Sequence, residues 1–205
     1  MENEASNITV IILAAGASNR MGEPKQLLKW GNSTLLGSTI EKAKKLRATK
    51  VVVVLGANYK LINKAIEPSK VTILNNLNWK NGLGNSIAFA VNYILQTTIK
   101  TDAVLFMLSD QPFIEVDFLN TMVNQFQEGK QSIIATSYDD HRYGVPAIFD
   151  KIYFKELLQL NDDNGAKHLL KKYKYHIKVL IPPAKNVDLD FKKDYLKFYK
   201  TYFKK

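Results

Sequence analysis

The sequence has no cysteine, which excludes a disulfide, a zinc–thiolate site and a thiol nucleophile. Histidine is scarce, and His141, His168 and His176 lack the spacing of metal ligands, so we expect structural or surface roles for them. No apolar run is long enough to span a bilayer, and the polar stretch Met1–Asn7 is unlike a signal peptide. These absences favour a cytoplasmic protein without membrane contact.

What is present is the composition of an ordinary globular domain. With 205 residues, 46% of them apolar, the chain can form one domain, 1–205, with a sizeable core. The formal net charge of +10 could indicate nucleic-acid binding. However, the lysines are dispersed and the sequence carries no nucleic-acid-binding motif, so we interpret them as a solvated surface and expect no nucleic-acid partner.

The first strand and the loop after it carry the strongest functional signal. Ile8–Leu13 is an apolar run typical of a strand buried on both faces of a parallel sheet. From Ala14 to Ser18 every side chain is small, so a ligand can approach the backbone amides, and Gly16 can supply a positive φ. Arg20 and Lys25 then add two cations. Bare amides and cations at the carboxyl end of a strand predict a phosphate site.

Apolar runs alternate with amphipathic segments, which predicts an α/β fold with a mainly parallel sheet and helices on both faces. The strands expected first are Ile8–Leu13, Val51–Leu55, Val71–Leu74 and Ala103–Leu108, and the helices are Thr34–Leu46, Tyr59–Ile66, Gly84–Leu95 and Val116–Phe126. A hairpin-like pair of strands, Ser132–Ser137 and Val145–Phe149, is expected next. The remaining expected elements are the helices Ile152–Leu160, Gly165–Tyr173 and Lys192–Tyr202, and the strand His176–Ile181.

Asp110 is a candidate metal ligand. It follows the predicted strand Ala103–Leu108 and should therefore lie on the same sheet edge as the small-residue loop. A carboxylate beside phosphates repels them unless a cation lies between the two. Oxygen ligands combined with phosphates favour Mg²⁺. A second carboxylate should come from another segment, since one ligand seldom fixes an ion.

Several motifs resemble those of the MobA-like NTP transferase superfamily, whose fold is Rossmann-like. The first is Leu13-Ala14-Ala15-Gly16-x-Ser18-x-Arg20-Met21-Gly22-x-x-Lys25, and Pro24-Lys25-Gln26-Leu27-Leu28 is similar to the molybdenum cofactor cytidylyltransferase branch. The resemblance implies a three-layer α/β/α fold and transfer of CMP from CTP to molybdopterin with release of pyrophosphate. It implies catalytic roles for Arg20, Lys25 and Asp110, and Mg²⁺ binding by Asp110 and Asp190. The implied nucleotide-binding residues are Leu13, Ala14, Ala15, Gly16, Ala17, Ser18, Arg20, Lys25, Asn76, Gly82 and Ser86.

The later segments match the superfamily with substitutions. Around Asp190, Phe191 and Lys192 replace Thr-Pro. Asp190 is favoured as the second metal ligand and Asp188 stays open as the alternative, while Asp188 and Asp194 can instead cap or start the last helix. Val145 replaces the histidine of the superfamily's Gly-His-Pro segment, and Lys167 replaces an arginine. Both of these changes fall in the half expected to bind the acceptor. Trp79, in the segment Asn76–Ser86, is interpreted as an anchor for its loop rather than a base-stacking residue.

Two other functions stay open at this level. One is a sugar-phosphate or polyol-phosphate nucleotidyltransferase. The other is a non-catalytic protein that binds molybdenum cofactor and hands it to a partner such as a molybdenum hydroxylase. Release of pyrophosphate separates the enzymes from the carrier, because a carrier releases none.

Overall fold

The computed structural model describes residues 7–48, 50–66, 69–139, 142–184 and 186–203. His141 lies outside these residues, while His168 and His176 are exposed, in keeping with the surface roles expected for them. None of the helices in the described ranges combines the length and apolar character needed to cross a membrane.

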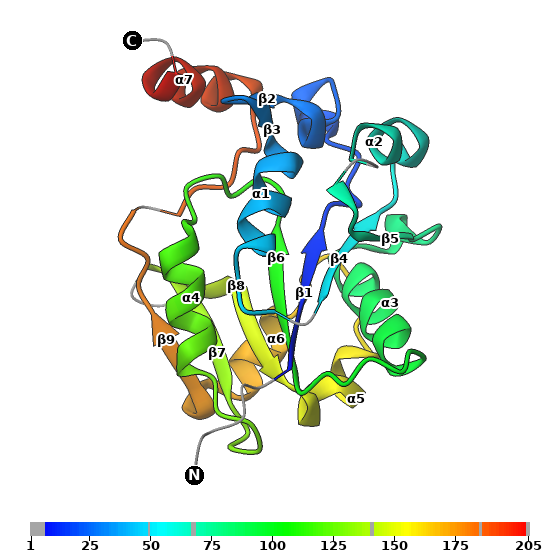
Figure 1. Ribbon diagram of the computed structural model, residues 1–205, viewed down its shortest axis with the longest axis vertical. Helices are drawn as coiled ribbons and strands as arrows, with labels where there is room; N and C mark the ends of the chain where they lie inside the picture. The colour runs from blue at the N-terminus through cyan, green and yellow to red at the C-terminus, as the bar shows by residue number, and fades with distance from the viewer. Residues whose placement is uncertain (1–6, 49, 67–68, 140–141, 185, 204–205) are drawn as a thin grey trace.

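A seven-stranded sheet with the order β5-β4-β1-β6-β8-β7-β9 forms the centre of the protein (Figure 1). Its strands are β1 (Ile8–Leu13), β4 (Lys50–Leu55), β5 (Thr72–Asn75), β6 (Ala103–Leu108), β7 (Ile133–Asp139), β8 (Arg142–Asp150) and β9 (Ile177–Leu180). β1 pairs in parallel with β4 and β6, as do β4 with β5 and β7 with β9, whereas β8 is antiparallel to β6 and β7. The predicted mainly parallel sheet is therefore confirmed.

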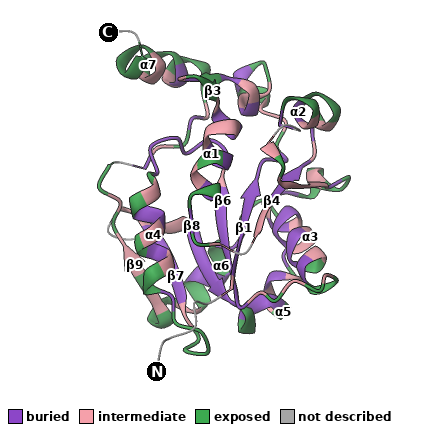
Figure 2. Cartoon of the chain, in the orientation of Figure 1, coloured by how far each residue is buried: buried purple, intermediate pink, exposed green. Residues whose placement is uncertain are grey.

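Helices cover both faces of this sheet. They are α1 (Leu35–Lys44), α2 (Tyr59–Ile66), α3 (Leu83–Leu95), α4 (Val116–Gln125), α5 (Phe154–Leu157), α6 (Lys167–Lys172) and α7 (Lys192–Phe203). Val10 and Ile12 of β1 belong to a core shared with α1, α2 and α4, whereas Ile11 and Leu13 belong to a core shared with α3, α5 and α6. Successive strand residues point to opposite faces, which explains the unbroken apolar run of β1. Figure 2 shows these central strands as buried, and the three-layer prediction is confirmed.

A small hairpin and α7 form a third apolar cluster that the sequence did not predict. The hairpin strands are β2 (Lys29–Trp30) and β3 (Ser33–Thr34). Trp30 packs edge-to-face on Phe113 and Phe203, with ring centroids 5.6 and 5.1 Å apart. Leu189 is fully buried in the same cluster. The cluster therefore fixes the segment before α7, which carries Asp188 and Asp190, close to the loop after β6.

Candidate functional site

The ends of β1 and β6 bring two loops together at one edge of the sheet. Leu13 is the register partner of Leu108, so both strands end at the same level. Lys25 follows from the first strand, on a short 3-10 turn, and Asp110 follows directly from the second. The backbone N–H of Leu189 donates to the carbonyl of Asp110 at 3.0 Å. Three segments that are distant in sequence therefore meet at this edge.

The side chain of Gln26 shapes the loop after β1. It is buried, and its Nε2 donates to the carbonyl oxygens of Ala14 and Gly16, each at 2.9 Å. The carbonyl of Ala15 accepts from the backbone N–H of Ala57 at 2.9 Å. All three carbonyls thus bond within the protein, and the N–H of Ala14 donates to the carbonyl of Val54 at 2.9 Å. The groups that the loop can offer a ligand are therefore the amides that follow Ala14.

The left-handed residue of this loop is Ser18, with φ 60°, and not Gly16, for which the sequence analysis expected a positive φ. The hydroxyl of Ser18 donates to Gln26 Oε1 at 3.3 Å and accepts from the backbone N–H of Lys25 at 3.1 Å. These bonds compensate the strained backbone of Ser18. A Cβ added to Gly16 would meet nothing within 4 Å, so this glycine leaves open space beside the loop.

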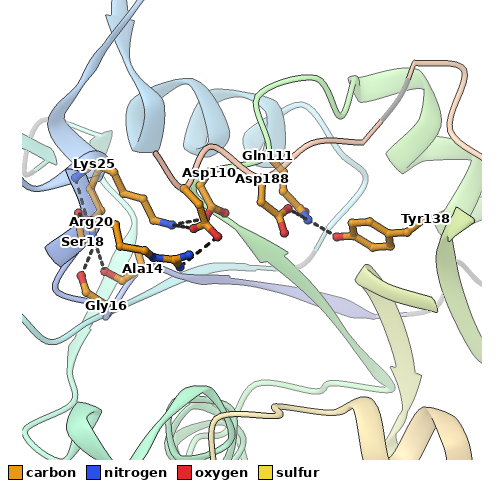
Figure 3. A network of polar contacts seen from close by, with 11 residues as sticks. Ala14, Gly16, Ser18, Arg20, Lys25, Asp110, Gln111, Tyr138 and Asp188 are labelled. Atoms are coloured by element: carbon orange, nitrogen blue, oxygen red, sulfur yellow. Dashed lines mark hydrogen bonds and ion pairs between the residues drawn. The ribbon is translucent and has the colours of Figure 1, made fainter. Parts of the chain in front are cut away.

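Four charged side chains form a network across the edge (Figure 3). The Lys25 ammonium binds the carboxylate of Asp110 and lies 3.2 Å from Asp190 Oδ1. Arg20 Nη2 donates to Asp190 Oδ2 at 3.0 Å, and its guanidinium lies over the ring of Phe191, 5.1 Å from the centroid. Phe191, which departs from the superfamily pattern, therefore contacts Arg20 directly.

The electrostatics of the network follow from burial and charge pairing. Burial alone would lower the pKa of Lys25, but the carboxylates of Asp110 and Asp190 outweigh it and hold that pKa above its ordinary value. Burial raises the pKa of the neighbouring Asp188 carboxyl, and the negative charge of Asp110 adds to the rise. Lys25 therefore keeps its proton, and its positive charge lies among three carboxyl groups.

Two adjoining clefts open on the network. The larger, of about 350 Å³, is lined among others by Leu13, Ala14, Ala15, Gly16, Lys25, Trp79, Gly82, Ser86 and Asp110. The second, of about 320 Å³, is lined by Gly16, Ala17, Ser18, Asn19, Arg20, Met21, Lys25, Trp79 and Asp190. Together they contain all of the predicted site residues except Asn76. Trp79 lines both clefts, so its ring is available to a ligand as well as anchoring its loop.

The segment before α3 and the first turn of that helix also line the larger cleft, through Trp79, Gly82 and Ser86. Asn76 is buried, and its Nδ2 donates to Asn85 Oδ1 at 3.0 Å and to Ser86 Oγ at 3.1 Å. Asn76 therefore holds the first turn of α3 in place from within the protein. The backbone N–H of Gly84 donates to the carbonyl of Asp162 at 2.7 Å. The N–H of Gly82 likewise donates to the carbonyl of Trp79 at 3.2 Å, so both of these amides at the helix start are already bonded within the protein.

A second polar cluster continues the edge toward β7 and β8. Gln111 Nε2 has three acceptors within hydrogen-bond distance for its two hydrogens: Asp188 Oδ1 at 2.8 Å, the hydroxyl of Tyr138 and the carbonyl of Val145 at 3.2 Å. The Tyr138 hydroxyl donates to the same carbonyl at 2.6 Å. Burial and the charge of Asp188 raise the pKa of Tyr138, so the hydroxyl keeps its proton. Asp188 therefore belongs to this cluster, in addition to any role in starting α7.

The donor atoms of the site fit a hard divalent cation that is shared with phosphates. Oδ1 of Asp110 is buried and accepts no hydrogen bond from any described residue. Within the described ranges, no group of three or more histidines and carboxylates is arranged to hold a metal by itself. A cation bound here would need further oxygen ligands from a phosphate or from water, which is the usual coordination of Mg²⁺ in phosphoryl-transfer sites.

Sequence reasoning missed three residues that shape the site. Gln26 directly follows Lys25, and Gln111 directly follows Asp110. Because Lys25 and Asp110 were already candidate site residues, this adjacency was the available signal. Tyr138 gave none, because its contact with Gln111 depends on how β7 and β8 pair.

The sequence matches a known family and several known proteins. Residues 10–177 match the family described as MobA-like NTP transferase domain. The chain is 31% identical over 150 residues to nicotine blue oxidoreductase from Paenarthrobacter nicotinovorans, covering 70% of the chain and 71% of that protein. It is 28% identical over 125 residues to molybdenum cofactor cytidylyltransferase from Escherichia coli, covering 61% and 62%. A third relative, the bifunctional protein GlmU of Pseudomonas putida, is 25% identical over 185 residues, and the match spans 39% of its length.

Solved structures share the fold over nearly the whole chain. The crystal structure of Rv0371c from Mycobacterium tuberculosis superimposes with a TM-score of 0.82 at 26% identity, covering 97% of this chain and all of that one. A structure of the same mycobacterial protein in complex with manganese gives a TM-score of 0.78 at 24% identity, with 96% and 100% coverage.

Proposed function

The chain belongs to the MobA-like NTP transferase family, and on that premise we propose that it transfers a nucleotidyl group from a nucleoside triphosphate to a phosphate-bearing acceptor. An oxygen of the acceptor phosphate attacks the α-phosphorus, the bond from that phosphorus to the bridging oxygen of the β-phosphate breaks, and pyrophosphate leaves. The reaction needs no covalent bond to the protein, because positioning and charge neutralisation can supply most of the rate acceleration.

One observation carries the proposal: a cleft that joins loop amides, two cations and two carboxylates. The carbonyls of Ala14 and Gly16 bond to Gln26 and the N–H of Ala14 bonds to Val54, which leaves the loop amides after Ala14 for phosphate oxygens. Lys25 and Arg20 stand beside the same loop and would neutralise charge that develops on the phosphates. The smallness of Ala14–Ser18, noted in the sequence, lets a triphosphate reach these groups.

The carboxylates would hold a divalent cation, for which we propose Mg²⁺. When bound, such a cation supplies charge neutralisation and orientation to the phosphates. Asp110 offers a buried oxygen, Oδ1, that accepts no hydrogen bond from a described residue. Asp190, from the segment before α7, shares the Lys25 ammonium with Asp110, since its Oδ1 lies 3.2 Å from Lys25 Nζ. The manganese complex of the mycobacterial structure supports a divalent cation in proteins with this fold.

For the substrates we propose CTP and molybdopterin, and for the recipient of the product a molybdenum hydroxylase. Support comes from the similarity to the Escherichia coli molybdenum cofactor cytidylyltransferase. Residues 24–28, Pro-Lys-Gln-Leu-Leu, are the part of the phosphate loop that most resembles that branch. Val145 and Lys167 are the two positions at which the acceptor side departs from it.

The test is pyrophosphate release, measured with each nucleoside triphosphate in turn, with and without molybdenum cofactor, in the presence of Mg²⁺. We expect release with CTP that depends on the cofactor. Release with another nucleotide and a sugar phosphate would move the assignment to a different nucleotidyltransferase. No release with any pair, together with tight binding of the molybdenum cofactor, would indicate the carrier instead.

Two substitutions test the residue roles. Lys25→Ala and Asp110→Ala should each lower kcat/KM by about a hundredfold or more, as the loss of preorganised charge often does. Lys44→Ala removes an exposed lysine of α1 that pairs only locally with Glu41 among the described residues, so it serves as the matched control. Folded Lys25→Ala and Asp110→Ala variants with turnover close to that of the control would contradict the roles.

A further inference from the structure

The site neutralises itself in the absence of a ligand. The Lys25 ammonium bridges the carboxylates of Asp110 and Asp190, and Arg20 takes the second oxygen of Asp190. The side chains of Lys25 and Asp110 are only 17% and 9% exposed, so water screens this pair weakly. The groups expected to bind phosphates and the groups expected to bind a cation are thus occupied by one another.

Lys25 is the movable member of the central pair. Its ammonium ends a flexible four-carbon chain. The backbone of Asp110 is fixed, because its carbonyl accepts the N–H of Leu189 at 3.0 Å and Leu189 is fully buried. Moreover, Oδ1 of Asp110 is buried with no donor among the described residues, which marks unused coordination capacity beside the ammonium.

We propose that Lys25 occupies, in the ligand-free protein, the place that the divalent cation takes on the carboxylates, and that it exchanges with that cation when nucleotide binds. The inference rests on the proposed function. Lys25 leaves Asp110 and Asp190 for the phosphates, while the carboxylates pass to the divalent cation. Every charge keeps an opposite partner before and after the exchange.

Neither half of the exchange is favourable alone. If a cation binds without nucleotide, Lys25 loses its two partners and remains as a poorly hydrated ammonium beside a second positive charge. If nucleotide binds without a cation and draws Lys25 away, two bare carboxylates face the phosphates. Cation and nucleotide therefore bind cooperatively, and the coupling is reciprocal by linkage.

Arg20 provides a graded comparison. Among the described carboxylates it pairs with Asp190 only, through Nη2 and Oδ2, and its side chain is 60% exposed. Removing the Arg20 side chain frees Oδ2 of Asp190 and leaves the Lys25–Asp110 pair intact. Its effect on cation binding should therefore be weaker than that of Lys25.

The experiment measures Mn²⁺ affinity by electron paramagnetic resonance on the full chain, without nucleotide. Lys25→Met should bind Mn²⁺ about tenfold more tightly than the wild type, which lies within the usual range for coupled sites. Arg20→Met should tighten binding by about two- to threefold, as expected for an exposed pair. Lys44→Met, the matched control on α1, should bind as the wild type does.

Equal or weaker Mn²⁺ binding by a folded Lys25→Met variant would overturn the exchange. If that variant does not fold, Arg20→Met decides, since its exposed side chain is not needed in the core: tighter binding supports the exchange and unchanged binding overturns it. Equilibrium dialysis of CTP with Mn²⁺ separates the two proposals. If the wild type binds CTP but the Lys25→Met variant binds Mn²⁺ with unchanged affinity, the exchange is refuted and the proposed function stands. Suppose instead that Lys25→Met binds Mn²⁺ more tightly, while the wild type binds neither CTP nor any other nucleoside triphosphate dialysed in the same way. That result supports Lys25 as the stand-in cation and refutes the function.

Discussion

Replacing Gln26 by leucine should damage both stability and nucleotide binding, although Gln26 contacts no charged group of the site. Its amide fills a buried position and satisfies the carbonyls of Ala14 and Gly16 at 2.9 Å each. Leucine keeps nearly the same volume but offers no donor. The substitution therefore removes hydrogen bonds with little change in packing.

The magnitude follows from the two carbonyls. A buried acceptor left without a donor costs about 1 to 3 kcal/mol. The carbonyl of Ala14 lies in a buried contact, whereas that of Gly16 is partly accessible and can recover a water. Allowing for the apolar gain of leucine, we expect the free energy of unfolding to fall by about 2 to 4 kcal/mol. The carbonyls would also be free to turn toward the cleft, where they would repel phosphates.

Urea denaturation gives the stability change, and calorimetric titration of CTP with Mg²⁺ gives the change in affinity. Gln159→Leu is the control, because Gln159 is exposed and its loss should stay within about 0.5 kcal/mol. A Gln26→Leu protein with the stability and CTP affinity of the control would refute the view that this side chain holds the loop.

Two further predictions concern the loop before α3 and the far end of the sheet. Gly82→Ala should lower the melting temperature and raise the KM for nucleotide, since Gly82 has φ 98° and a Cβ there would lie 2.5 Å from the carbonyl of Asp162. Gly129→Ala is the control: Gly129 has φ 72° and a Cβ there would meet no atom within 4 Å, so this variant should show only the modest cost of backbone strain. Burial alone would raise the pKa of Asp102, but hydrogen bonds from Asn7 and Lys151 lower it to about 2. The charged form therefore contributes stability above about pH 4, which is lost as the pH falls through about 2. Asp102→Asn should remove about 1 to 2 kcal/mol at pH 7, a value reduced because Lys151 is 46% exposed. Denaturation curves at several pH values test this: equal stability of wild type and variant at pH 7 would contradict it.

Periodicity was enough to predict the central elements. β1, α2 and β6 have the predicted bounds. The apolar residues of β1 and β6 are packed on both faces of the sheet, and those of α2 are packed in one of the two cores, so each apolar pattern matches its element. The hairpin of β2 and β3 was missed since each strand has only two residues, too few to show a period. The contact of α7 with Trp30 was missed as well, because it joins segments that no sequence pattern links.

The site divides in a similar way. Arg20, Lys25 and Asp110 could be singled out because their side chains are charged and follow buried strands. Their pairing with one another could not be foreseen, since it depends on the position of the segment before α7. Gln26 and Tyr138 act through hydrogen bonds to backbone carbonyls. The sequence places Gln26 beside Lys25 but does not show which carbonyls it binds, and for Tyr138 it gives no signal at all.

A crystal structure with a non-hydrolysable CTP analogue and Mg²⁺ tests the central claim most directly. We predict the triphosphate against the amides after β1, with Lys25 on its phosphates and the cation in contact with Asp110. Phosphates bound elsewhere, with Lys25 still joined to Asp110 and Asp190, would contradict the account.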